Sequence, residues 1–212
     1  MMTAPKKLGW IMLFGIAFGL IEAAVVVYLR ASYYPEGFDM TVGRLPTAIL
    51  WTEIIREAAT IVVLISVGVL AGTTWLARTG SVFVAFGVWD IFYYVWLRVF
   101  IGWPETLLTW DVLFLIPKMW TGPVLAPVLV SLALVGCGGW IVLKREAGLP
   151  LRIAALDWTV EIAAGALIIA AFLSNDGVSM PETFPWWLFL TGLAGGVFYF
   201  VWRVEGGKPI HK

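Results

Sequence analysis

The sequence predicts an all-α integral membrane protein, a polytopic transmembrane helical bundle with about six spans in a single domain, residues 1–212. Three observations predict this class. Of the 212 residues, 61% are hydrophobic and only 13% are charged, whereas a soluble globular chain carries about 25% charged residues. The mean hydropathy is +0.92. Finally, six apolar runs are long enough to cross a bilayer core, which requires about 20 mostly apolar residues per helix.

The apolar runs place the predicted spans at about 8–29, 46–77, 81–102, 121–143, 153–173 and 184–204. The first run follows Lys6 and Lys7 and is longer than the roughly 7–15 apolar residues of a secretory signal peptide. We therefore expect it to be retained as a span. The second run exceeds what one span requires, so its first turns, Pro46 to Arg56, are expected at the membrane interface.

A short apolar piece, Leu107–Ile116, lies between the third and fourth predicted spans and is bracketed by Pro104 and Pro117. At about ten residues it is too short to cross a bilayer. We predict a short re-entrant or interfacial helix there.

Basic residues predict the orientation, because cytoplasmic segments of membrane proteins are enriched in Lys and Arg. With the N-terminus inside, nine basic residues fall on the cytoplasmic side and five on the outer side. The tryptophans gather near both predicted interfaces, as indoles do in membrane proteins. We therefore predict a multi-pass protein of the cell inner membrane with its N-terminus and C-terminus cytoplasmic.

The composition also limits which cofactors and partners can be expected. The only histidine is His211, next to the C-terminus, and the only cysteine is Cys137. A haem or metal ligated by His or Cys is therefore not expected at membrane depth, and no other cofactor can be predicted. The net charge is zero, so nucleic acid is not indicated as a partner. The predicted partners are the lipid bilayer and, in one interpretation, other membrane subunits.

Small residues predict where the first helix meets a neighbour. Gly15 and Gly19 are four residues apart and Ala23 continues the same face. Such a stripe lets two helix backbones approach closely. Glu22 follows Gly19 by three residues and shares this packed face.

Ionisable side chains form an acidic set in the outer half of the predicted bundle. A charge near the bilayer centre costs roughly 2.5–3.5 kcal/mol, so such a group must pair, be neutralised or face water. The candidates for binding a cation or proton are Glu22, Glu53, Glu57, Asp90 and Asp111, with Arg56, Tyr94 and Arg98 as supporting residues. Five acids against two bases leave three carboxylates without a basic partner.

Two interpretations of this acidic set stay open. In the structural one, the charges pin helices together, through Arg56 with Glu53 or Glu57 and through Arg98 with Asp90 or Glu22. In the functional one, the surplus carboxylates face a cavity open to the outside and bind a cation or a proton. Glu22 is then the favoured central group, because its face packs against a neighbouring helix, and Asp90 is the second.

A balanced set lies in the inner half, where Asp157 and Glu161 are accompanied by Arg152 and Arg203. Two acids and two bases compensate one another. We expect these residues to pair structurally between the fifth and sixth spans.

Three functions from different classes follow from these patterns. The surplus of carboxylates favours a protein that binds or conducts a cation or proton, alone or as a subunit of a larger membrane complex. The first alternative is an intramembrane enzyme that uses carboxylates, with or without a divalent metal such as Mg²⁺, Ca²⁺ or Mn²⁺. The second is a non-catalytic structural or assembly subunit.

Overall fold

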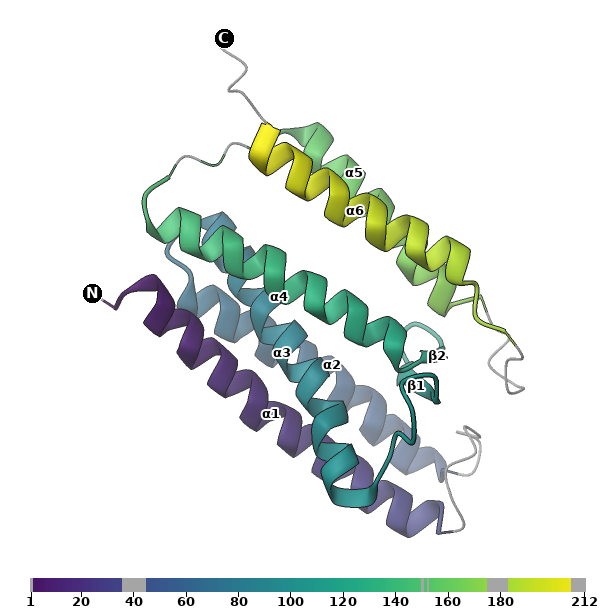
Figure 1. Ribbon diagram of the computed structural model, residues 1–212. Helices are drawn as coiled ribbons and strands as arrows, with labels where there is room; N and C mark the ends of the chain where they lie inside the picture. Colours follow the sequence, from purple (N-terminus) through teal and green to yellow (C-terminus); the bar gives the residue numbers. More distant parts are fainter. Residues whose placement is uncertain (1, 36–44, 150, 152, 175–182, 207–212) are drawn as a thin grey trace.

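Six long apolar helices make up most of the computed structural model, which describes residues 2–35, 45–149, 151, 153–174 and 183–206. The helices are α1 (Ala4–Tyr33), α2 (Thr47–Ala71), α3 (Trp75–Ile101), α4 (Leu125–Glu146), α5 (Ala155–Phe172) and α6 (Trp186–Gly206) (Figure 1). Each contains a segment long and apolar enough to cross a membrane. The chain is thus an all-α polytopic membrane bundle, which confirms the predicted fold class.

The turn between α2 and α3 lies earlier than predicted. The second span was expected to reach residue 77, but α2 ends at Ala71 and α3 begins at Trp75. A Cβ at Gly72 would lie 2.3 Å from the backbone nitrogen of Arg78, so only glycine fits this turn. Thr74 then caps α3 by accepting a hydrogen bond from the Ala77 N–H at 3.2 Å. Hydropathy misplaced the boundary because the chain stays mostly apolar on both sides of this turn.

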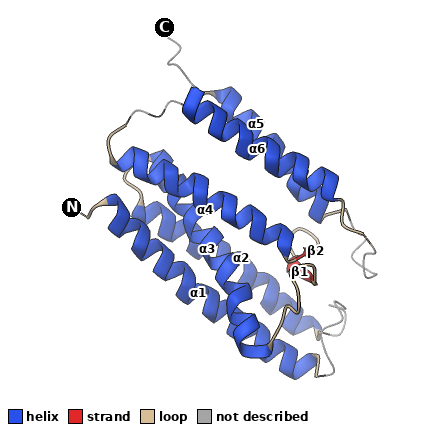
Figure 2. Ribbon diagram, viewed as in Figure 1, coloured by secondary structure: helices blue, strands red, loops and turns tan. Residues whose placement is uncertain are grey.

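The segment between α3 and α4 is a β-hairpin, so the predicted re-entrant or interfacial helix is wrong. Strands β1 (Trp110–Phe114) and β2 (Trp120–Pro123) pair antiparallel, with Asp111 opposite Gly122 (Figure 2). Pro117 lacks the N–H that a continuing helix would need, and aromatic and β-branched residues favour strands. The hairpin satisfies its backbone groups across the two strands, as buried backbone requires.

The helices run antiparallel in sequence, so the bundle has two distinct ends. The hairpin end carries β1 and β2, the C-terminal ends of α1, α3 and α5, and the N-terminal ends of α2, α4 and α6. The opposite end carries the N-terminal ends of α1, α3 and α5 and the C-terminal ends of α2, α4 and α6 (Figure 1). The start of the first helix and the end of the last one lie on the same side, as an even number of antiparallel spans produces.

Helix α3 lies at the centre and packs against α1, α2 and α4. Glycines permit the close approach that the sequence predicted: a Cβ at Gly19 would lie only 2.8 Å from the Trp89 carbonyl oxygen. The α5–α6 pair forms a separate layer beside α4 (Figure 1). At the opposite end the two layers meet through the rings of Trp140 and Phe200, whose centroids are 5.8 Å apart. At the hairpin end, Trp120 of β2 stacks on Phe172 of α5 at 6.2 Å.

Candidate functional site

A cavity of about 1090 Å³ lies between the α5–α6 layer and the rest of the bundle. Its wall is mainly apolar, but charged side chains line it at both ends. All five predicted outer acids line the cavity at the hairpin end: Glu22, Glu53, Glu57, Asp90 and Asp111. The described members of the predicted inner set line it at the opposite end: Asp157, Glu161 and Arg203. The structure thus brings each set to one end of a shared cavity.

Arg56 joins two of the outer acids. Its Nε and Nη2 atoms donate to Glu53 Oε2 at 2.9 and 2.7 Å, and its Nη1 atom donates to Glu22 Oε1. The Thr60 hydroxyl donates to the second oxygen of Glu22 at 3.2 Å. Because α1 supplies Glu22 and α2 supplies the other three residues, this network ties the two helices together and gives both acids a basic partner.

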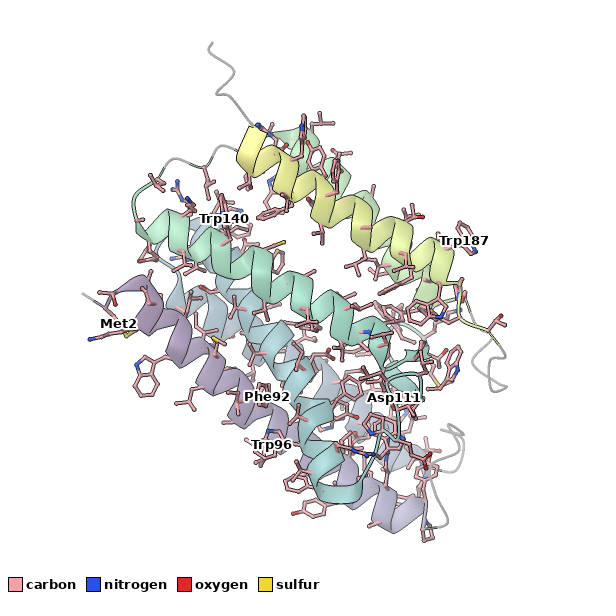
Figure 3. All side chains as sticks on the ribbon, viewed as in Figure 1. Met2, Phe92, Trp96, Asp111, Trp140 and Trp187 are labelled. Carbon is pink, nitrogen blue, oxygen red and sulfur yellow. The ribbon has the colours of Figure 1, made fainter. Side chains whose placement is uncertain are left out.

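Asp111 is brought to the same end by the hairpin, as Figure 3 shows. Its carboxylate accepts a hydrogen bond from the Tyr94 hydroxyl at 3.2 Å and lies 3.6 Å from Arg30 Nη2. The Arg30 guanidinium in turn lies 3.8 Å from the ring centroid of Trp103, a cation–π contact. Burial raises the pKa of Asp111 to about 7, and Arg30 offsets only part of this rise. Burial of Asp111 therefore favours its protonated form.

The hydrogen-bond partners that the described residues give Glu57 and Asp90 are neutral, although the charge of Arg56 also acts on Glu57. The Leu115 N–H donates to both oxygens of Glu57, at 2.8 and 3.1 Å, which ties α2 to the hairpin. The Ser131 hydroxyl donates to Asp90 Oδ2 at 2.7 Å, which ties α3 to α4. Within the described ranges, no basic side chain lies within 4.0 Å of either carboxyl. Glu57 and Asp90 therefore make up most of the excess of carboxyls over basic side chains at the hairpin end.

Arg98 does not belong to this network, and its predicted pairing with Asp90 or Glu22 is wrong. It is exposed near the end of α3, where it donates to the carbonyl oxygens of Gly102 and Pro104, the latter at 2.8 Å. The last carbonyls of a helix carry partial negative charge and lack intrahelical partners. They therefore attract the guanidinium away from the buried carboxyl of Asp90, which lies about two turns earlier on α3.

The opposite end of the cavity holds an ion pair between α5 and α6. Asp157 Oδ1 accepts from the Tyr199 hydroxyl at 2.7 Å and from Arg203 Nε at 2.8 Å. Its second oxygen accepts from the Ala154 N–H at 2.6 Å and so caps α5. Glu161 lies one turn further along the cavity wall. Arg152, the fourth predicted member of this set, lies outside the described residues.

Sequence reasoning missed several partners of the predicted residues. Arg30 lies eight residues after Glu22, which is about two helical turns and so the same face of α1. That spacing could have identified Arg30 as a member of the site. No comparable sequence signal identifies Ser131, because nothing in a single sequence pairs α4 with Asp90. A further ion pair, Lys7 with Glu146 at 2.8 Å, joins α1 to α4 at the opposite end and was also missed.

A metal site of the kind that the enzyme alternative requires is not seen in the described part of the chain. No three or more Asp, Glu, His or Cys side chains there are grouped so that they could hold a metal ion. The outer carboxylates are instead distributed among Arg56, Ser131, Tyr94 and the hairpin backbone. This arrangement does not support the divalent-metal version of that alternative.

Comparison with protein-family models, with curated proteins and with solved structures finds no match for this chain. What the chain binds must therefore be inferred from the residues of the cavity.

Proposed function

We propose that this membrane protein binds and exchanges protons at the hairpin end of its cavity, with Glu57, Asp90 and Asp111 as the proton-binding groups. One observation carries the proposal. Glu57 and Asp90 line the cavity, yet within the described ranges neither has a basic side chain within ion-pair distance. Asp90 is buried, and a carboxylate removed from water without a counter-charge is strongly disfavoured and instead takes up a neutralising partner. Glu57 is half-buried, so the same argument applies to it in part.

A proton suits these positions better than a metal ion. Metal ions such as Ca²⁺ require six or more oxygen ligands, and even Mg²⁺ keeps an octahedral shell. The described carboxyls do not converge in such a group. A proton needs only one carboxyl oxygen, and Ser131, Tyr94 and the Leu115 N–H hold the three carboxyls in place. Glu22 and Glu53 are both paired with Arg56, so this proposal assigns them a structural role.

Infrared titration of the purified protein in lipid nanodiscs tests the proposal. Between about pH 5 and about pH 9, the wild type is expected to lose a protonated-carboxyl signal as the pH rises, in the range where carboxyls with raised pKa values titrate. Asp111→Asn should remove the component with a midpoint of about 7. Asp90→Asn and Glu57→Gln should each remove signal from one further carboxyl, because both changes keep the shape of the side chain but not its titrating proton.

Glu105→Gln is the matched control, since Glu105 is exposed on the loop before β1 and makes none of the cavity contacts. It should leave the titration unchanged. An identical titration in all three cavity variants would refute proton binding there. If added sodium removes the protonated signal at constant pH, a metal cation competes with the proton for these carboxyls, and a site that binds protons alone is refuted.

In the orientation proposed for this function, the protein lies in the cell inner membrane. Its hairpin end faces outward and both termini are in the cytoplasm. It is tested by single cysteines introduced after Cys137 is replaced by alanine. Glu105→Cys, at the hairpin end, should react with a membrane-impermeant maleimide in intact cells. Ala147→Cys, exposed after α4, should react only after permeabilisation. The reverse pattern would invert the proposed orientation.

A further inference from the structure

Glu161 is a cavity-lining carboxyl that the proton-binding groups of the hairpin end do not include. It lies on α5, six residues after Ala155, the first residue of that helix. At a rise of about 1.5 Å per residue, it is about 9 Å along the axis from the start of α5, and so within a helix apolar enough to cross a membrane. Ionisable side chains at membrane depth are costly, and those that persist commonly belong to ion or proton pathways.

Glu161 has no partner in the part of the chain that the structure describes. Asp157, one turn earlier on α5, is bound by Tyr199 and Arg203 of α6. Within the described ranges, Glu161 itself makes neither an ion pair nor a hydrogen bond. On the α4 side its charge acts on Cys137, which also lines the cavity and supplies no positive charge. The one nearby base, Arg203, is therefore already bound to a different carboxylate.

Helix α6 leaves room for the Glu161 carboxyl at the cavity wall. A Cβ at Gly196 would lie 3.2 Å from Glu161 Oε2, which is tighter than ordinary van der Waals contact. The carboxyl thus lies against the α6 backbone, and because Glu161 is only half-buried it keeps contact with the cavity. A carboxyl in this setting without a base is satisfied by water or by a proton.

One face of α4 connects Glu161 to the hairpin-end group Asp90. Ser131, which donates to Asp90, and Cys137, on which the charge of Glu161 acts, both line the cavity. The two α4 residues are six positions apart, which is about 9 Å along the helix axis. Since hydrogen-bonded oxygens lie about 2.8 Å apart, a chain of a few water molecules spans that gap. The carboxyls at its two ends are the polar partners that such water needs.

We propose that Glu161 is a second proton-binding group and that protons cross the cavity between it and Asp90. Protonated Asp90 gives its proton to a cavity water, and a proton of the water chain passes to the Glu161 carboxylate. At each step one O–H bond breaks and one forms, and no electron is transferred. Asp90 is left as a carboxylate and Glu161 as a neutral acid. This inference rests on the proposed function, because the hairpin-end groups supply or receive the proton.

Proton flux into proteoliposomes tests the transfer. The full chain is reconstituted with the pH-sensitive dye pyranine inside, and potassium with valinomycin balances the charge. After a drop in external pH, the wild type should acidify the interior faster than protein-free liposomes do. Glu161→Gln and Asp90→Asn should each reduce the flux to the protein-free rate, whereas Glu161→Asp, which keeps a carboxyl, should retain flux. Glu105→Gln is the control and should match the wild type, because Glu105 is exposed and does not line the cavity.

Infrared titration separates this inference from the proposed function. Glu161→Gln should remove the signal of one carboxyl and leave the Asp111 component unchanged, which also shows that the variant has kept its fold. Wild-type flux at the protein-free rate, or undiminished flux in Glu161→Gln, would overturn the transfer while leaving proton binding at the hairpin end intact. Flux that requires Glu161 but not Asp90 would overturn the path between them. The proposed function fails separately, if the hairpin-end variants leave the infrared titration unchanged.

Discussion

Replacing Arg56 by glutamine is expected to destabilise the protein by about 3 kcal/mol, at the lower end of the range for breaking a buried ion pair. The change leaves Glu22 and Glu53 without their shared cation in a setting where their side chains are only 12% and 9% exposed. The lower end applies because the guanidinium itself is 27% exposed. Thermal unfolding in detergent, followed by circular dichroism, measures the loss.

A second substitution separates loss of the ion pair from loss of packing. In the Arg56→Gln background, Glu22→Gln removes one orphaned charge and should restore part of the lost stability. The two single changes should therefore not be additive. Arg98→Gln is the matched control, because Arg98 is exposed and donates its hydrogen bonds to the backbone carbonyls of Gly102 and Pro104. Additive losses from Arg56 and Glu22, or an equal loss from Arg98→Gln, would show that the Arg56 network does not hold the bundle together.

The spans could be predicted from the sequence because hydropathy depends on composition over a whole helix. Long apolar runs with few charges require helices in lipid, since no other open structure satisfies the backbone there. The α2–α3 turn was misplaced because it depends on one close backbone approach at Gly72, which hydropathy does not register. The hairpin was missed for a related reason: a run of about ten apolar residues fits a short helix or a strand equally well.

The candidate site could be predicted only as far as single helices allow. Spacing along α2 places Glu53, Arg56 and Glu57 near one another, but it could not decide which acid the arginine holds. In the structure, Arg56 donates to Glu53 on its own helix and to Glu22 on a different helix. Glu57 instead accepts a hydrogen bond from the Leu115 N–H, and that contact exists only because the hairpin folds back toward α2. Partners across helices depend on packing, and a single sequence carries little of that information.

The packing itself is open to a sharp test at two adjacent glycines of α4. A Cβ at Gly138 would lie 2.6 Å from the backbone oxygen of Gly80 and 2.8 Å from Phe83 Cβ, whereas a Cβ at Gly139 meets nothing within 4 Å. The first contact is with rigid backbone of α3, so Gly138→Ala must push the two helices apart. We expect it to cost about 1–3 kcal/mol, the usual penalty for overpacking.

Gly139→Ala is the control with the same chemical change one residue away. It should be neutral or slightly stabilising, because alanine is preferred over glycine in a helix by about 1 kcal/mol. Thermal unfolding of the two variants in the same detergent gives the comparison. Displacement of α4 by Gly138→Ala should also disturb the Ser131–Asp90 hydrogen bond, which joins the same two helices, and so shift the infrared band of the Asp90 carboxyl. Equal unfolding temperatures for the two variants would mean that α3 and α4 do not approach each other through Gly80 and Gly138. The placement of Asp90 against α4 would then be refuted as well.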